Sequence, residues 1–508
     1  MKSVLEYLEQ SAERYPDKIA AADETSVCTY GELLNQARKI GSFLVPRIEN
    51  RDSVVCFMEK SNACLQAFLG IVYAGGFYTL LDPDFPQERI KQIMSVLTPK
   101  VIITTHKYDQ QLQKLGSETA VIYLESIPAE ICAEGLAERR KNMSDRDPLY
   151  CNFTSGSTGV PKGVLVCHQS VIDFIDVFTE TFHLSHEDVF GNQAPFDFDV
   201  SVKDIYSSLK VGGTLVIIPK AYFMTPAKIV EMLEEYHVTT LIWAVSALCM
   251  LMRLHALKHL RPSNIQKIMF SGEVMPIKQL NQWMAFYPDA MFVNLYGPTE
   301  ITCNCTYHIL DRAYTDNEKI PIGIPFKNER VFLLDEQDRL VKDDKVGEIC
   351  VAGTALALGY YRNSEMTAKH FVQNPLQKDY PEMVYRTGDL ASYQDGVLMF
   401  MGRKDFQIKH MGHRIELEEI EAALNGMQEI THCCCMYDTG KNKIVAFYCG
   451  SVDKTTVFRN MKEIVPEYMV PNIFNQLAEI PLTKNGKTDR KLLFEQYQKG
   501  TLRYASMA

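Results

Sequence analysis

The stretch CNFTSGSTGVPKGV, residues 151–164, predicts both a fold and a binding site. Apolar residues up to Phe153 are typical of a buried strand. The loop that follows carries hydroxyls, glycines and one lysine: Thr154, Ser155, Ser157, Gly156, Gly159, Gly163 and Lys162. Glycines let backbone N–H groups approach an anion, hydroxyls donate further hydrogen bonds and lysine adds a positive charge. The pattern therefore predicts a polyphosphate cradle at the end of a strand.

Two other interpretations of this loop can be compared with the cradle. The loop does not match G-x-x-x-x-G-K-[ST], so it is not a Walker A loop. A flexible Gly/Ser turn between two strands is the plainer alternative, and it would be favoured if the stretch stood alone. The choice between the two depends on the rest of the chain.

Composition limits what kind of protein this is. The chain has 508 residues, of which 46% are hydrophobic and 23% charged, so it is too apolar for disorder and too long for one core. We expect a large body and at least one further domain. The net charge is −10, which disfavours broad attraction to a nucleic-acid backbone.

The cysteines and the N-terminal sequence indicate the compartment. None of the 14 cysteines forms a C-x-x-C pair, and reduced thiols are the expected state. The first residues, MKSVLEYLEQ, carry acids early and no apolar core of a signal peptide. The longest apolar stretch, residues 241–252, is shorter than the ~20 residues that span a bilayer. We therefore expect a cytoplasmic protein without membrane insertion.

The order of predicted elements gives an α/β fold. Strand-like and helix-like segments alternate over much of the first 300 residues, which predicts doubly wound parallel sheets. Residues 317–360 contain shorter strands with Gly and Pro turns, which suggests a small β-barrel section. A compact α+β pattern follows GRKD at 402–405. We expect an N-terminal domain at 1–402 and a small C-terminal domain at 403–508.

Several further motifs follow one another along nearly the whole chain. They are TYGEL (29–33), AGGFYTLLDPDFPQERI (74–90), NLYGPTE (294–300), GEICVAG (347–353), YRTGDL (385–390), GRKDFQIKHMGHRIELEEIE (402–421) and PLTKNGKTDRKLL (481–493). With the loop at 151–164, this set resembles the adenylate-forming superfamily, which includes acyl- and aryl-CoA ligases, luciferases and nonribosomal peptide adenylation domains. The resemblance implies a large body and a mobile C-terminal lid.

The resemblance implies a set of ATP-binding residues: Thr154, Ser155, Gly156, Ser157, Thr158, Gly159, Lys162, Asn294, Tyr296, Gly297, Thr299, Asp389, Arg403 and Lys487. Tyr296 would stack on adenine, and Asn294 could bond the base edge. Asp389 and Arg403 would hold the ribose hydroxyls. Thr299 and Glu300 would lie near the phosphates, with Glu300 as the Mg²⁺ ligand. Taken alone, each of these motifs is an ordinary turn.

The same resemblance implies catalytic and hinge residues. Lys487 would bridge the substrate carboxylate and the α-phosphate, with Thr154 and Glu300 assisting. The lid would swing about Lys404 and Asp405 between two half-reactions. The segment that would then enter the site reads KHMG at 409–412, where many relatives have an arginine before the glycine. The resemblance therefore defines the thiol-acceptor contacts less well than it defines the ATP site.

The stretch NQAPFDFDVSVKDIYSSL, residues 192–209, indicates which acid is activated. In the amino-acid branch of the superfamily, an aspartate in this motif receives the α-ammonium of the substrate, and Asp199 occupies that position. The alternative is that Asp199 caps the following helix and pairs with Lys203. Acyl- and aryl-CoA ligases generally lack this aspartate.

Motif alignment implies a side-chain pocket lined by Val200, Lys203, Ala244, Met269, Ser271, Leu295, Cys303 and Asn304. The chain looks closest to stand-alone D-alanine:carrier-protein ligases, but Ser271 and Lys203 replace their cysteine and methionine. A buried lysine is costly unless it meets a charge, so Lys203 suggests a substrate with a carboxylate side chain. Pairing of Lys203 with Asp199 or Asp204, which would merely narrow the pocket, is an equal alternative.

The function implied by the resemblance is activation of an amino acid with ATP and Mg²⁺. The aminoacyl group would then pass to the phosphopantetheine thiol of a carrier protein, expected to act in trans because no carrier-like motif is found. The alternatives are a D-alanine:carrier-protein ligase proper, an acyl-CoA ligase, and a nucleotide-binding protein without turnover. Cys303 and Cys305 follow NLYGPTE, and small core packing is favoured for them over covalent catalysis.

Lys487→Ala is predicted to abolish adenylate formation while ATP still binds, because the implied bridging contact is made in the transition state. Isotope exchange between pyrophosphate and ATP measures the first property, and calorimetric titration with ATP measures the second. A variant that loses ATP binding as well would contradict this role.

Overall fold

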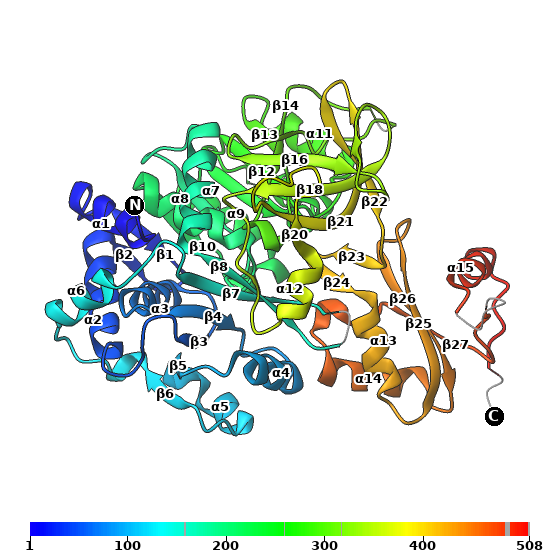
Figure 1. Cartoon of the computed structure of the whole chain (residues 1–508), viewed down its shortest axis with the longest axis horizontal. Coiled ribbons are helices and arrows are strands. Elements are labelled where there is room, and N and C mark those ends of the chain that lie inside the picture. The colour runs from blue at the N-terminus through cyan, green and yellow to red at the C-terminus, as the bar shows by residue number, and fades with distance from the viewer. Residues whose placement is uncertain (157–158, 259, 316, 483–487, 506–508) are drawn as a thin grey trace. The chain divides into compact units, whose positions relative to one another are not determined.

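The computed structural model describes residues 1–156, 159–258, 260–315, 317–482 and 488–505 (Figure 1). The chain divides into two compact units. The first comprises Met1–Pro83, Leu97–Asn152 and Gly163–Lys404. The second comprises Asp84–Val96, Phe153–Lys162 and Asp405–Ala508. The loop at 153–162 therefore belongs to the same unit as the C-terminal segment, although it lies far from that segment in sequence.

The largest sheet of the first unit has nine strands in the order β15-β14-β13-β12-β11-β9-β10-β1-β2. Its central strands, from β1 to β13, pair in parallel, and the pairs at both edges are antiparallel. The strands are β1 (Ile19–Ala22), β2 (Val27–Thr29), β9 (Val189–Asn192), β10 (Thr214–Ile217), β11 (Thr240–Ala244), β12 (Lys267–Ser271), β13 (Met291–Tyr296), β14 (Thr306–Leu310) and β15 (Ile324–Pro325).

A second sheet has seven strands in the order β19-β8-β7-β4-β3-β5-β6. The strands are β3 (Ser53–Phe57), β4 (Phe77–Leu81), β5 (Val101–Thr104), β6 (Ala120–Tyr123), β7 (Pro148–Thr154), β8 (Lys162–Cys167) and β19 (Gly359–Tyr360). Every residue of β3, β4 and β11 is buried. Burial of both strand faces is what a parallel sheet covered on two sides requires, and it explains the continuous apolar runs in the sequence.

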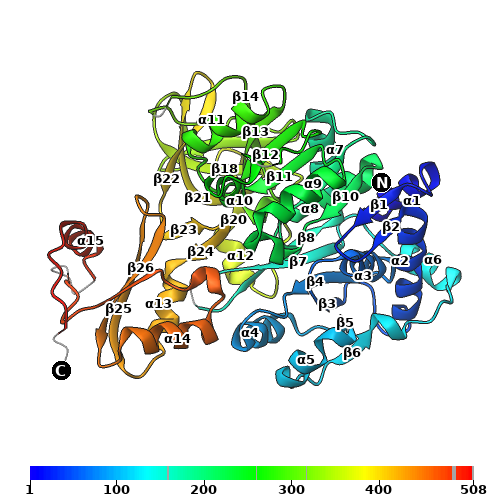
Figure 2. The same cartoon turned by 180° about the vertical axis from the view of Figure 1, so that it is seen from behind.

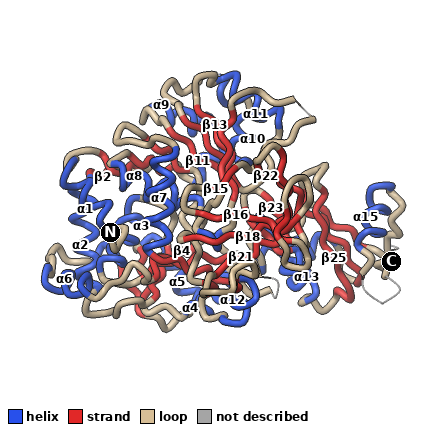
Figure 3. The backbone as a smooth tube through the Cα atoms, turned by 45° about the horizontal axis from the view of Figure 1, so that its top comes forward, coloured by secondary structure: helices blue, strands red, loops and turns tan. Residues whose placement is uncertain are grey.

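A third sheet in the first unit is antiparallel, with β16, β18 and β21 side by side (Figure 3). Its strands are β16 (Glu329–Leu334), β17 (Leu340–Val341), β18 (Gly347–Gly353), β20 (Phe371–Gln373), β21 (Met383–Gln394) and β22 (Val397–Arg403). This sheet lies where the sequence predicted a small β-barrel section. Strand β22 pairs with β21, and Leu398 of β22 also forms an isolated bridge with Gly323.

Helices cover the parallel sheets. They are α1 (Leu5–Arg14), α2 (Tyr30–Leu44), α3 (Asn62–Tyr73), α5 (Asp109–Leu115), α6 (Ala133–Lys141), α7 (His168–Thr181), α8 (Val200–Val211), α9 (Pro226–Glu235), α10 (Val245–Arg253), α11 (Ile277–Phe286) and α12 (Ser364–His370). Helix α8 packs against β9, β10 and β11 (Figure 2). Ten consecutive residues of α8, from Val200 to Leu209, are buried, including charged ones. The predicted acid pocket therefore begins on a fully enclosed helix.

The second unit contains two small sheets and several helices. The strands are β23 (Gln407–His410), β24 (His413–Glu416), β25 (Ile430–Asp438), β26 (Lys443–Gly450) and β27 (Ile473–Gln476), and the helices are α13 (Leu417–Asn425), α14 (Lys454–Ile464), α15 (Arg490–Lys499) and most of α4 (Gln87–Leu97). Its core includes Ile420, Leu424, Tyr448 and Met461, all fully buried. The mixed helices and strands match the expected α+β character of this segment.

The described part of the chain contains neither a helix that could cross a bilayer nor a disulfide bond. No helix there combines the length and the apolar character that crossing a bilayer requires. All cysteines carry free thiols, including Cys303 and the adjacent Cys433, Cys434 and Cys435.

Lys60 holds the end of β9 in place, where the chain leaves the sheet toward Asp199. Its ammonium donates to the carbonyl oxygens of Asn192 (3.3 Å), Gln193 (2.7 Å) and Ala194 (3.2 Å), and to Asn192 Oδ1 (3.0 Å). Gln193 and Ala194 lie beyond the end of β9, so their carbonyls are not used by the strand ladder, whereas the carbonyl of Asn192 also accepts from the N–H of Ile218 at 3.1 Å. Lys60, in the turn between β3 and α3, thus donates hydrogen bonds to the backbone carbonyls at the start of the segment that leads to Asp199.

Lys60→Met should lower the free energy of unfolding of the first unit by about 2 kcal/mol, since it leaves partly buried carbonyls without a donor. Denaturant titration measures the change. Lys107→Met is the matched control, because Lys107 is exposed, pairs with Glu59 at 2.8 Å and lies over the ring of Tyr108. Equal stability of the two variants would show that the Lys60 contacts do not hold this segment.

Candidate functional site

The predicted phosphate loop holds carboxylates of its own unit. The N–H of Gly156 donates to Glu419 Oε2 at 2.8 Å, and Lys162 Nζ lies 3.3 Å from Glu416 Oε1. Ser155 Oγ accepts from the N–H of Glu416 at 3.0 Å and donates to a backbone carbonyl, that of Arg414, at 2.8 Å. The amide and ammonium donors of the loop thus face carboxylate oxygens, and its hydroxyl donor faces a backbone carbonyl; all three are donors of the kind that phosphate binding requires.

Glu419 is fixed from both sides. Its other oxygen forms an ion pair with Arg89 of α4, and both side chains are nearly fully buried. Burial raises the pKa of Glu419, and the Arg89 guanidinium and the Gly156 amide oppose that rise. The carboxylate is therefore held in the loop by one positive charge and one backbone donor.

Thr154 and the glycines have separate tasks in the loop. Thr154 Oγ1 is buried and has no hydrogen-bond partner among the described residues. A buried hydroxyl without a partner is costly, and an oxygen-rich ligand would satisfy it. At Gly156 a Cβ would lie 2.0 Å from the carbonyl oxygen of Val160, and Gly159 has a positive φ of 81°. Both glycines are required, one by close approach and one by backbone conformation.

Sequence reasoning missed the contacts of Glu416 and Glu419. Both lie in GHRIELEEIE, a segment assigned only to the family pattern. Glu416 ends β24 as the N-cap residue of α13, and Glu419 lies in the first turn of that helix, so two carboxylates three residues apart at a helix start were the available signal. Ser157, Thr158 and Lys487, also predicted to bind ATP, lie outside the described residues.

Three predicted nucleotide-binding residues meet in the first unit. Asp389 on β21 and Arg403 on β22 are register partners, and Arg403 Nη1 donates to Asp389 Oδ1 at 2.5 Å. The Tyr296 hydroxyl at the end of β13 donates to Asp389 Oδ2 at 2.6 Å. Burial, reinforced by the Asp389 charge, raises the pKa of Tyr296 well above its ordinary value, so the phenol remains a neutral donor. The structure therefore links Tyr296, Asp389 and Arg403 through one carboxylate.

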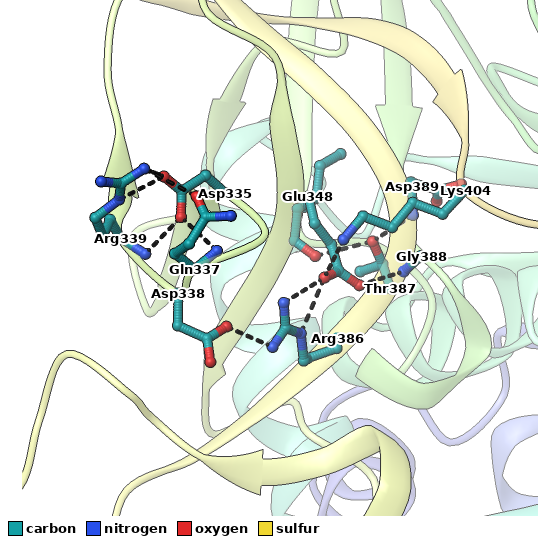
Figure 4. Close-up of polar contacts among 11 residues, drawn as sticks. Asp335, Gln337, Asp338, Arg339, Glu348, Arg386, Thr387, Gly388, Asp389 and Lys404 are labelled. Atoms are coloured by element: carbon teal, nitrogen blue, oxygen red, sulfur yellow. Dashed lines mark hydrogen bonds and ion pairs between the residues drawn. The ribbon is translucent and has the colours of Figure 1, made fainter.

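Glu348 on β18 orients the chain before Asp389 (Figure 4). Its Oε1 accepts from the N–H of Gly388 at 3.1 Å, and its Oε2 accepts from Arg386 Nη2 at 2.6 Å and Lys404 Nζ at 3.1 Å. Lys404 is one of the two predicted hinge residues, and it is the last residue of the first unit. GEICVAG, which contains Glu348, was quoted only as a family motif, so this support was also missed.

The remaining residues of NLYGPTE lie in or just after β13. Asn294 Nδ2 donates to the carbonyl oxygen of Pro321 at 2.8 Å. Glu300, fully buried, accepts at Oε1 from the Tyr360 hydroxyl at 2.7 Å. Thr299 is buried in the same turn. The described residues contain no cluster of three or more His, Cys, Asp or Glu that could hold a metal ion by themselves.

Whether Glu300 can bind Mg²⁺ depends on the chemistry of its carboxylate oxygens. Glu300 supplies a hard carboxylate, and Tyr360 occupies one of its two oxygens as a hydrogen-bond donor. Mg²⁺ usually takes one or two protein carboxylates and completes its shell with water and substrate phosphate. A single carboxylate is thus compatible with a Mg²⁺ ion that arrives with a nucleotide.

Residues predicted to line the acid pocket lie close to Lys203 of α8. Lys203 Nζ donates to Asn304 Oδ1 at 2.6 Å and lies 3.5 Å from Ser271 Oγ at the end of β12. Cys303 Sγ donates to the backbone oxygen of Asp199 at 2.9 Å. Burial raises the pKa of the Cys303 thiol well above its ordinary value, which disfavours a reactive thiolate. The structure thus brings five predicted pocket residues together.

Four other predicted lining residues are buried in the same unit: Val200, Ala244, Met269 and Leu295. The turn that carries Cys303 and Asn304 packs directly against the backbone of Gly297. A Cβ at position 297 would lie 2.4 Å from Asn304 Cα and 2.7 Å from the carbonyl oxygen of Cys303. Only glycine allows this approach between the motif NLYGPTE and the turn that carries Asn304.

The alternative structural role of Asp199 does not match the geometry. Asp199 directly precedes α8, but its side chain makes no capping hydrogen bond to the first turn. Within the described residues, Lys203 forms no ion pair with Asp199 or with Asp204.

A family comparison identifies the chain. The model of the AMP-binding enzyme family matches residues 8–361. The chain belongs to the AMP-binding enzyme family. Zwittermicin A synthase ZmaJ from Bacillus cereus is 32% identical over 499 residues, which cover 96% of this chain and 93% of ZmaJ. Tyrocidine synthase 3 from Brevibacillus parabrevis is 33% identical over 496 residues.

Coverage differs greatly among the relatives. The chain spans 7% of tyrocidine synthase 3 and 45% of tyrocidine synthase 1, both from Brevibacillus parabrevis. Among solved structures, the Vibrio cholerae adenylation domain AlmE, in complex with glycyl-adenosine-5'-phosphate, matches with a TM-score of 0.84 and 21% identity over 98% of both chains. The adenylate-forming resemblance and the α/β fold class predicted from sequence are confirmed, and ATP is the nucleotide that this family of adenylating enzymes uses.

Gly156→Ala should weaken ATP binding by about 10-fold or more, corresponding to about 1.4 kcal/mol, because the new Cβ would displace the backbone of the loop. Calorimetric titration with ATP measures the change. Gly426→Ala is the matched control in the same unit, since its Cβ would lie no closer than 3.4 Å to a neighbouring atom. Unchanged ATP affinity in Gly156→Ala would contradict a phosphate-binding role for the loop.

Proposed function

We propose that this chain activates an amino acid with ATP as an aminoacyl-AMP and transfers the aminoacyl group to the phosphopantetheine thiol of a carrier protein in trans. The observation that carries the proposal is Asp199, a buried carboxylate at the N-cap position of α8 whose side chain makes no capping hydrogen bond to the helix. A carboxylate in such a place, in an adenylating enzyme, is suited to bind the α-ammonium of an amino acid.

Two solved structures support the choice of substrate and partner. AlmE was solved with glycyl-adenosine-5'-phosphate, an aminoacyl adenylate. PA1221 is an NRPS protein that contains adenylation and PCP domains, and it shares the fold with a TM-score of 0.81. By similarity, an aminoacyl adenylate and a carrier protein are the expected intermediate and partner of this chain.

In the first half-reaction, a carboxylate oxygen of the amino acid attacks the α-phosphorus of ATP. An oxygen–phosphorus bond forms and the bond to the β-phosphate oxygen breaks, which releases pyrophosphate. Catalysis is then mainly positioning and neutralisation of negative charge. Lys487 would contact the reacting carboxylate and α-phosphate, and Thr154 would donate its hydroxyl to phosphate.

Different residues would bind the ribose, the adenine and the phosphates of the nucleotide. Asp389 and Arg403 would hold the ribose hydroxyls, and Tyr296 would pack on the adenine. Lys162, with Ser155 and the loop amides, would contact phosphate oxygens once Glu416 and Glu419 are displaced from them. Mg²⁺, held by Glu300, would supply positive charge that neutralises the phosphates.

In the second half-reaction, the sulfur of the phosphopantetheine thiol attacks the acyl carbon of the aminoacyl-AMP. A thioester forms and AMP leaves. We propose that Lys404 and Asp405 act as the hinge between the two half-reactions. A D-alanine:carrier-protein ligase uses the same steps, whereas an acyl-CoA ligase uses CoA as the thiol and needs no residue for an ammonium group.

Asp199→Asn should lower kcat/KM for the amino acid by about 100-fold, since a charge-assisted contact to the ammonium is lost, and leave ATP affinity unchanged. Pyrophosphate exchange measures kcat/KM. Asp335→Asn makes the same chemical change in a surface ion pair with Arg339 and serves as the control.

Hydroxamate trapping with amino acids, aryl acids and fatty acids tests the proposal as a whole. Trapping with amino acids alone is expected. Trapping with fatty or aryl acids and not with amino acids would favour the acyl-CoA ligase alternative, and no trapping with any acid would favour a nucleotide-binding protein without turnover.

A further inference from the structure

Lys203 is a fully buried lysine whose ammonium contacts uncharged groups. Its exposed fraction is 0%, and its two polar contacts are the amide oxygen of Asn304 and the hydroxyl of Ser271. Within the described residues, no carboxylate oxygen lies within 4.0 Å of Lys203 Nζ. A buried charge without an opposite charge is costly. The interior of this pocket is therefore electrostatically incomplete without an anion.

Three hydrogen-bond donors converge at this place. An ammonium can only donate, so Asn304 must turn its amide oxygen toward Lys203. The NH₂ group of Asn304 then remains as a donor for a ligand. Ser271 Oγ receives the Lys203 contact and retains its own O–H as a donor. Ammonium, amide and hydroxyl donors together suit a ligand that only accepts, and an ionised carboxylate is such a group.

Asp204, which directly follows Lys203 on α8, does not supply that anion. Asp204 Oδ2 accepts from Asn192 Nδ2 at 2.8 Å, and Asp204 Oδ1 is buried without a partner among the described residues. Burial raises the pKa of Asp204 to about 7, so it is a weak source of negative charge at neutral pH. Burial also lowers the pKa of Lys203, which a bound carboxylate would reverse.

We propose that the pocket selects an α-amino acid whose side chain ends in a carboxylate, bound by Lys203 with Asn304 and Ser271. This inference rests on the proposed function and adds the class of substrate. It makes Lys203 a specificity-determining residue of this chain.

The spacing along α8 supports an acidic amino acid. Asp199 and Lys203 are four residues apart, so they lie on one face of the helix with a rise of about 6 Å between them. One position presents a negative charge and the other a positive charge. An acidic amino acid carries the complementary pair, an α-ammonium and a side-chain carboxylate joined by a short carbon chain. A neutral substrate would leave Lys203 unpaired.

Pyrophosphate exchange with a panel of amino acids tests the inference. The panel contains both enantiomers of Asp and Glu, their neutral isosteres Asn and Gln, and the small substrates Gly and D-Ala. We expect kcat/KM for the best acid to exceed that for its own amide by about 100-fold. Because this ratio is measured on the unmodified protein, it does not depend on whether a variant folds.

The variant Lys203→Met assigns the preference to one side chain. It should reduce the ratio of acid to amide to about 1, because the charge that distinguishes the two substrates is gone. Lys210→Met is the control on the same helix, since Lys210 pairs with Asp176 at 2.6 Å outside the pocket and should keep the full ratio. Ser271→Ala should give an intermediate ratio.

The outcomes separate this inference from the proposed function. Exchange with Gly or D-Ala in preference to every acid would overturn the acidic substrate and leave amino-acid activation standing. An acid preference that persists in Lys203→Met would overturn the role of Lys203. No exchange with any amino acid would overturn the proposed function and this inference together.

Discussion

The buried ammonium of Lys203 constrains the architecture of the pocket more than any other single group. It requires an oxygen acceptor, and Asn304 supplies one at 2.6 Å. Asn304 can come that close only because Gly297 has no side chain in its way. Gly297 directly follows Tyr296, whose hydroxyl binds Asp389. One short segment around β13 therefore couples the position of the substrate side chain to that of the predicted nucleotide contacts.

The loop at 153–162 presents the opposite electrostatic arrangement. Its Gly156 amide and its Lys162 ammonium are matched by Glu419 and Glu416 of the same unit. The same donors would serve phosphate oxygens, so the carboxylates and a nucleotide compete for one set of groups. A site that handles negative charge must also satisfy its donors when no substrate is present, because buried unpaired donors are costly.

Sequence patterns predicted the fold class, which is confirmed, and they named candidate site residues, whose roles stay predictions, because the motifs report local chemistry. The cradle loop, NLYGPTE and YRTGDL each give residue types and order within a few positions. They could not predict Glu348 beneath Asp389 or Lys60 beneath the end of β9, since both contacts join segments far apart in sequence. Lys487 was assigned by resemblance and stays a prediction. Whether Lys203 forms an ion pair with Asp199 or Asp204 could be decided only from the distances between their side chains in the structure.

The most direct measurement is a crystal structure with a non-hydrolysable analogue of glutamyl-AMP. The account predicts that the α-ammonium lies at Asp199 and that a side-chain carboxylate oxygen lies about 2.8 Å from Lys203 Nζ, with Asn304 as a second donor. A structure in which the analogue binds with its side chain directed away from Lys203, or with no contact between the ammonium and Asp199, would contradict the account.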